Sequence, residues 1–124
     1  MTISGDNYRQ IGRALAGAVS VVMAHERGSH AMVGLTVSSF VTLSFEPPLV
    51  MFAIQHDANS YPAIVSCRHF GVSVLAANQD GIAARFAVKG QDKLTGTPIE
   101  TGEVLAVPLI AGSLAQIECS TSQI

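Results

Sequence analysis

The stretch Gly34-Leu35-Thr36-Val37-Ser38-Ser39-Phe40 decides the fold prediction for this sequence. It places small hydroxyl residues and backbone N–H groups between two apolar segments that are predicted to be strands. A connection of this kind can hold the polar edge of a flat ring. Spacing alone favours an ordinary strand connection rich in Ser and Thr, so the choice depends on the rest of the chain.

Short apolar segments on both sides of this stretch predict a mainly β protein. Residues 19–24 and 31–35 are apolar and partly β-branched, and Glu26-Arg27-Gly28-Ser29 between them is a turn signal, so we expect a hairpin. Residues 39–45 alternate in polarity until Glu46-Pro47-Pro48 interrupts them. The continuous apolar run Leu49–Ile54 predicts a central strand, buried on both faces or covered by another subunit.

The second half of the chain adds further strands. We expect one at 70–76 and one or two within 109–121, with Leu114, Ile117 and Cys119 facing inward. At least six short β segments with few helices favour an antiparallel barrel or sandwich over a doubly wound parallel sheet.

Three short helices are predicted. The first is capped by Asp6 or Asn7 and packs on the rest through Ile11, Ala14, Leu15 and Ala18. The second covers 61–68 after Ser60 as its cap, and the third starts at Asn78 and ends near Lys89-Gly90. A long connection is expected at 91–107.

Composition limits the classes of function. The 124 residues predict a single domain, and a hydrophobic content of 48% with only 13% charged residues suggests a homo-oligomer. A net charge of -2 without any basic run argues against nucleic acid as a partner. The longest apolar run is too short to cross a membrane, and residues 1–5 do not read as a secretion signal, so a cytoplasmic location is expected. Cys67 and Cys119 are expected to be free thiols.

The usual catalytic and metal-binding patterns do not occur. The four His residues lack helical metal-ligand spacing and an acidic cluster, so we expect no metal site. Ser38, Ser39 and Ser60 lie in no nucleophile-elbow pattern, which disfavours covalent hydrolysis. Neither a Gly-x-Gly-x-x-Gly run nor a Walker loop is present.

A second candidate binding segment is Leu75-Ala76-Ala77-Asn78-Gln79. Small residues here leave a strand and open a helix whose first N–H groups have no partner within the helix, and such a start suits an anion. Arg85, two turns further along the same helix face, either contacts a phosphate or is a solvated surface residue.

Five blocks in order resemble the flavin-reductase-like FMN-binding split-barrel family, and the resemblance runs from about Leu15 to Cys119. The blocks are Gly34-Leu35-Thr36-Val37-Ser38-Ser39-Phe40, Glu46-Pro47-Pro48-Leu49-Val50, Ser60-Tyr61-Pro62, Phe70-Gly71-Val72-Ser73-Val74-Leu75 and Ala84-Arg85-Phe86-Ala87.

This resemblance implies a homodimer of antiparallel six-stranded split β-barrels that binds FMN, or FAD, beside the subunit interface. Thr36, Val37, Ser38 and Ser39 match the segment that holds the isoalloxazine and ribityl chain. Ala77, Asn78 and Gln79 match the turn near the phosphate, and Ser60 and Arg85 match polar positions around it. Leu94 stands after Lys93 where the family often has Phe.

The implied activity is hydride transfer from NADH or NADPH to flavin N5, often to supply a separate monooxygenase. Such a reaction requires stacked rings and no nucleophilic side chain, so we expect no catalytic residue. Family members usually continue into strands with a Gly-Asp-His segment near the nicotinamide, which these 124 residues do not contain. The alternatives are therefore a non-catalytic FMN-binding module and an interaction domain without a ligand.

Overall fold

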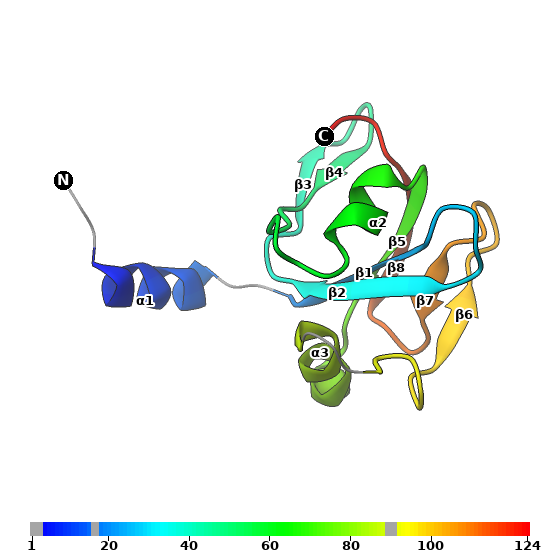
Figure 1. Ribbon diagram of the computed structural model, residues 1–124. Helices are drawn as coiled ribbons and strands as arrows, with labels where there is room; N and C mark the ends of the chain where they lie inside the picture. Colours follow the sequence, from blue (N-terminus) through cyan, green and yellow to red (C-terminus); the bar gives the residue numbers. More distant parts are fainter. Residues whose placement is uncertain (1–3, 16–17, 89–91) are drawn as a thin grey trace.

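The computed structural model describes residues 4–15, 18–88 and 92–124, and within them the protein is mainly β with a few short helices. Its centre is a four-stranded antiparallel sheet in the order β2-β1-β5-β8 (Figure 1). The bounds of these strands are β1 Ser20–His25, β2 Met32–Val37, β5 His69–Val74 and β8 Ala115–Ser120.

The predicted hairpin is confirmed as β1 and β2, which pair along their whole length from Ser20 opposite Val37 to His25 opposite Met32. The Glu26 N–H donates to the Ala31 carbonyl over 2.8 Å and closes the turn. Gly28 has a φ of 79°, a conformation that side chains disfavour, which explains why the turn contains glycine.

Strand β5 pairs with the other side of β1, also antiparallel, with Ser20 opposite Val74. Because β2 and β5 are both antiparallel to β1, they run in the same direction, and their carboxyl ends lie at the same end of the sheet. This arrangement places the segments after Val37 and after Val74 on either side of the start of β1.

Two apolar clusters cover the two faces of the sheet. On one face, α2 (Tyr61–Ser66) contributes Ile64, and β3 (Val41–Ser44) and β4 (Leu49–Met51) lie on the same side (Figure 1). On the other face, Phe86 of α3 (Asp80–Ala87) packs with Ile110 of β7 (Pro108–Ile110). The free thiols Cys67 and Cys119 belong to the first cluster.

Strand β7 pairs with β6 (Ile99–Thr101) in a small antiparallel sheet. The predicted connection 91–107 therefore contains a strand that the sequence pattern missed. Leu114, predicted to face inward, is 72% exposed in the turn before β8, whereas Cys119 is buried as expected.

The prediction of a central strand at Leu49–Ile54 is wrong. Only Leu49–Met51 form a strand, and β4 pairs with β3 alone in a separate two-stranded sheet. A cis peptide bond joins Glu46 to Pro47 in the turn between them. Among the described residues, residues 52–54 of the run do not pair with another strand. The apolar run therefore indicates an apolar surface and does not show that the segment lies inside the main sheet.

The helices also differ from their predictions. Helix α1 (Gly5–Leu15) contains Asp6 and Asn7, and the Ser4 hydroxyl accepts from the Asn7 N–H at its start. It stands apart from the sheets (Figure 1), with Ile11 48% exposed, so the predicted packing against the rest is wrong. Ser60 precedes α2 without a side-chain cap. Asn78 lies inside a 3-10 turn, Ala77–Gln79, and does not cap α3.

Candidate functional site

The two segments singled out by their sequence, 36–39 and 75–79, lie at the same end of the main sheet, on either side of the start of β1. Residues 36–39 contain the last two residues of β2, and residues 75–79 directly follow β5. Both strands end next to the start of β1. The Leu75 N–H donates to the Val19 carbonyl over 2.9 Å and ties the second segment to β1. Strand pairing thus brings together residues almost forty positions apart in sequence.

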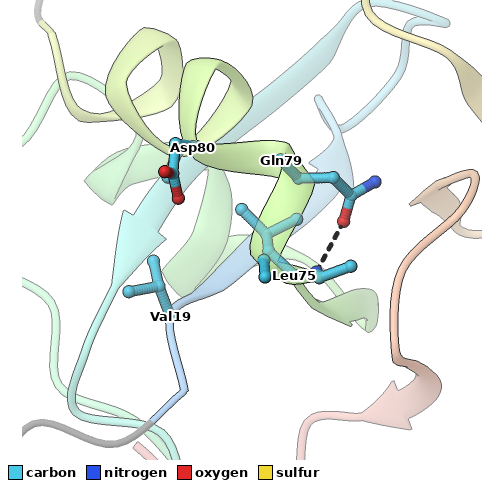
Figure 2. A pocket seen from close by; sticks show the side chains of 7 residues that line it. Val19, Leu75, Gln79 and Asp80 are labelled. Atoms are coloured by element: carbon cyan, nitrogen blue, oxygen red, sulfur yellow. Dashed lines mark hydrogen bonds between the residues drawn. The ribbon is translucent and has the colours of Figure 1, made fainter.

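A pocket of about 190 Å³ lies at this end of the sheet (Figure 2). Alanine side chains make much of its wall, and the Asp80 carboxylate is the one charged group among its lining residues. Pockets that enclose a whole drug-sized ligand are larger, roughly 300–1,000 Å³. This pocket therefore suits one edge of a larger molecule. It is lined by Val19, Leu75, Ala76, Ala77, Gln79, Asp80 and Ala83.

Gln79 fixes the shape of the pocket wall. Its side-chain oxygen accepts from the Ala76 N–H over 2.8 Å, and its nitrogen donates to the Ala111 carbonyl over 3.0 Å (Figure 2 shows the first bond). The side chain is buried, whereas Ala77 and Asn78 beside it are exposed. Gln79, which the sequence predicted to contact a cofactor, thus uses its side-chain amide to hold two parts of the backbone together.

Thr36 and Val37 face opposite sides of the sheet. The Thr36 hydroxyl donates to the Ala83 carbonyl over 2.7 Å, which joins β2 to the helix that lines the pocket. Val37 is buried in the core of the other face. Of this pair, only Thr36 places a polar group beside the pocket.

Ser38 and Ser39 begin the connection to β3. Ser38 is exposed directly after the end of β2. The Ser39 hydroxyl accepts from the Ala53 N–H over 2.9 Å and donates to the Ala53 carbonyl over 3.2 Å. A shallow depression of about 460 Å³, lined by residues 54–57, follows Ala53 in the chain. Through its bonds to Ala53, Ser39 therefore joins the end of β2 to the segment that leads into this depression.

Ser60 and Lys93 converge on one backbone oxygen of the outer strand β2. The Ser60 hydroxyl donates to the Gly34 carbonyl over 3.1 Å, and the Lys93 ammonium donates to the same oxygen over 3.2 Å. Lys93 also donates to the Phe86 carbonyl in the last turn of α3 over 3.3 Å. Burial lowers the pKa of Lys93, because the charged form is partly desolvated.

Lys93 is the site residue that sequence reasoning missed. The available signal was a cation just after a predicted helix, a position from which lysine often binds the last free carbonyls. That signal identifies a helix end. It does not predict that Lys93 shares the Gly34 carbonyl with Ser60, which lies in a distant part of the sequence.

Arg85 lies against the loop that follows Lys93. Its guanidinium donates to the Thr97 hydroxyl over 2.6 Å and to the Thr95 carbonyl over 3.3 Å. The Thr97 hydroxyl in turn donates to the Lys93 carbonyl over 2.7 Å. Ser60 and Arg85, predicted to share one site, are thus linked through Lys93.

The site fits a ligand held by hydrogen bonds near two cations, Lys93 and Arg85. Within residues 4–15, 18–88 and 92–124, no group of three or more His, Cys, Asp or Glu side chains lies together as metal ligands would. In the same ranges, no helix is both long and apolar enough to span a bilayer. The hydroxyls, small residues and Lys93 suit a phosphorylated aromatic molecule such as a flavin.

Comparisons with known proteins agree with this fit. The family model described as "Flavin reductase like domain" matches residues 11–124. The chain is 40% identical over 106 residues to the "Actinorhodin polyketide dimerase" of Streptomyces coelicolor, covering 85% of this chain and 58% of that protein. It is 35% identical over 114 residues to "Flavin-dependent monooxygenase, reductase subunit HsaB" of Mycobacterium tuberculosis, covering 92% and 59% respectively. The chain thus spans less than two thirds of each relative.

One similar solved structure is that of "NADH:FAD oxidoreductase SgcE6 in complex with NAD and FAD fragments" from Streptomyces globisporus. The TM-score is 0.82 at 29% identity, and the match covers 99% of this chain and 74% of that one. The chain therefore shares its fold with a protein that was solved in complex with NAD and FAD fragments.

Proposed function

Because this chain belongs to the family of flavin reductase like domains, we propose that it is an NAD(P)H-dependent flavin reductase acting on FMN or FAD. The observation that carries the proposal is that residues 36–39 and 75–79 flank the start of β1 at one end of the main sheet, where residues 75–79 line a pocket. The relative named as a monooxygenase reductase subunit and the neighbour solved with NAD and FAD fragments support it. NADH is the electron donor favoured by that neighbour's name.

A flavin supplies a ring that accepts hydride directly, so the protein has to position and shield it. The Thr36 and Ser39 hydroxyls are engaged with Ala83 and Ala53, and they hold the backbone of the 36–39 segment in place. Ser38, Ala77 and Asn78 are exposed at the same end of the sheet and are proposed to contact the flavin. No side chain is assigned as nucleophile, acid or base.

We further propose that the protein is a homodimer and that its second copy covers the β3–β4 hairpin. Five large apolar residues of this hairpin are exposed, among them Leu43 at 56% and Phe45 at 95%. Contiguous apolar surface of this kind usually marks an interface. The full set is Val41, Leu43, Phe45, Leu49 and Met51.

The six-stranded split barrel implied by the resemblance is also a proposal. Within the described residues there are eight strands in three separate sheets, of which the central one has four strands. The proposal treats the hairpins as closing the barrel around this central sheet, in one domain formed by residues 1–124. A monooxygenase that receives reduced flavin, and a cytoplasmic location with access to nicotinamide, complete the proposal.

The deciding experiment is NADH and NADPH oxidation followed by absorbance, with free FMN or FAD added to the purified chain. We expect oxidation that depends on both chain and flavin. Flavin binding without oxidation of either nucleotide would support the alternative of a non-catalytic flavin-binding module. Absence of both would leave an interaction domain without a ligand.

A further inference from the structure

We propose that the Asp80 carboxylate determines how tightly the site binds oxidised flavin relative to reduced flavin, because it repels the negative charge that the flavin ring gains on reduction. This inference rests on the proposed function and names a residue that discriminates between its substrate and its product. Asp80 lines the pocket of about 190 Å³ at the start of α3 (Figure 2). It is the one charged residue among the described residues that line this pocket.

The polar groups of the pocket wall leave Asp80 as the acceptor for a ligand. Gln79 is the other polar residue of the lining, and both ends of its amide are engaged, with the Ala76 N–H at 2.8 Å and with the Ala111 carbonyl at 3.0 Å. Asp80 is exposed, and within residues 4–15, 18–88 and 92–124 its carboxylate forms no hydrogen bond and no ion pair. A ring edge with an N–H group therefore has one free side-chain acceptor in this pocket.

The two cations of the site are engaged at the opposite end of α3. Lys93 donates to the Phe86 carbonyl over 3.3 Å, and the Arg85 guanidinium donates to the Thr97 hydroxyl over 2.6 Å. Asp80 and Phe86 are separated by about 9 Å along the helix axis. This separation is close to the Debye length of about 8 Å at physiological ionic strength. The charge of Asp80 therefore acts on the pocket without a cation beside it.

Hydride transfer changes the charge of the flavin ring. A hydride is one hydrogen nucleus with two electrons, so its transfer breaks the C4–H bond of the reduced nicotinamide and forms an N5–H bond on the flavin. The nicotinamide gains one positive charge, and a neutral oxidised ring gains one negative charge until it takes up a proton. A carboxylate accepts a hydrogen bond from a neutral N–H group and disfavours an anion beside it. Asp80 therefore weakens the binding of the product more than that of the substrate.

The helix start reduces this repulsion without cancelling it. The dipole of a helix is equivalent to roughly half a positive charge at its first turn, whereas the carboxylate of Asp80 carries a full negative charge. Like charges a few ångströms apart at a protein surface change an affinity on the order of tenfold. Salt screens exposed charges, so the preference for oxidised flavin should shrink as salt is added.

The test compares the affinities for oxidised FMN and for photoreduced FMN, both measured by ultrafiltration without oxygen. We expect the wild-type chain to bind oxidised FMN more tightly, with a preference that falls from low to high salt. Asp80→Asn keeps the size of the side chain and removes its charge, so it should raise the affinity for reduced FMN about tenfold relative to oxidised FMN. Glu26→Gln removes the same charge in the exposed β1–β2 turn, at the opposite end of the sheet, and should leave the preference unchanged.

A second variant separates charge from shape. Asp80→Glu keeps the charge and should keep the preference for oxidised FMN. An unchanged ratio of the two affinities in Asp80→Asn, or the same change in Glu26→Gln, would overturn the role of Asp80 and leave the proposed function standing. Equal affinities of the wild-type chain for the two forms would do the same. Failure of the wild-type chain to bind oxidised FMN would instead overturn the proposed function, and this inference with it.

Discussion

Replacing Gln79 with Met tests whether its side chain holds the pocket wall. The change keeps the length of the side chain and removes both of its polar atoms, so the bonds to the Ala76 N–H and the Ala111 carbonyl are lost. A protein hydrogen bond contributes about 1 kcal/mol net. Two lost bonds at a side chain that is 8% exposed therefore lower the free energy of unfolding by about 2 kcal/mol.

Urea unfolding followed by far-ultraviolet circular dichroism measures this loss. With an m-value of about 2 kcal/mol per molar urea for a small domain, the midpoint should fall by about 1 M. The neighbouring exposed residue gives the control, because Asn78→Ala should change stability by less than about 0.5 kcal/mol. We also expect Gln79→Met to weaken FMN and riboflavin alike, since it alters the shape of the wall and no phosphate contact.

An unchanged midpoint in Gln79→Met would refute this reasoning. It would mean that the two hydrogen bonds contribute nothing and that the amide is free to serve a bound cofactor. A loss of FMN binding alone, with riboflavin unaffected, would likewise contradict a purely structural effect and would place the phosphate near the 77–79 turn.

Three other changes test the packing, the interface and the loop beside the site. In Gly34→Ala, the new Cβ would lie 2.8 Å from Phe86 Cε1 and 2.9 Å from Met23 Cγ. Thermal unfolding should therefore show that overpacking lowers the free energy of unfolding by about 1–3 kcal/mol. An unchanged unfolding transition would contradict this close approach of α3 to β2. Leu43→Lys should convert the proposed dimer to a monomer in sedimentation velocity, and persistence of the dimer would move the interface off the β3–β4 hairpin. Hydrogen bonds lower the pKa of Asp92 below its ordinary value, and the bond from the Thr95 hydroxyl contributes most. The ionised carboxylate therefore stabilises the folded loop at pH values above about 3.9. This stabilisation is lost as the pH falls through the lowered pKa. Asp92→Asn should therefore remove part of the acid-induced fall in thermal stability, and an identical pH profile would show that the loop bonds contribute nothing.

Local features of the chain were predictable from sequence. The β1–β2 hairpin follows from two apolar β-branched segments around a turn that contains Gly28, and both signals lie within a few residues. The run Leu49–Ile54 was wrongly predicted to be a central strand. An apolar run indicates that its side chains are covered by other residues, but it does not identify those residues. In the structure, Leu49–Met51 pair with β3 alone, and Leu49 and Met51 are exposed.

The site was predictable where it consists of continuous segments. Residues 36–39 and 75–79 were singled out by composition and resemblance, but their placement at one end of the sheet depends on the shared pairing of β2 and β5 with β1. Ser60 resembled a helix cap, yet its hydroxyl bonds to Gly34, 26 residues earlier. Lys93 was missed for the same reason, since only the tertiary fold brings it to that carbonyl.

Hydrogen exchange with and without FMN tests the location of the site most directly. We expect added FMN to slow exchange of the backbone amides at 36–39 and at 76–80, with the β1–β2 turn at the opposite end of the sheet unchanged. Unaltered exchange in both segments at a saturating FMN concentration, or protection confined to other parts of the chain, would show that the end of the sheet shared by β2 and β5 does not bind flavin.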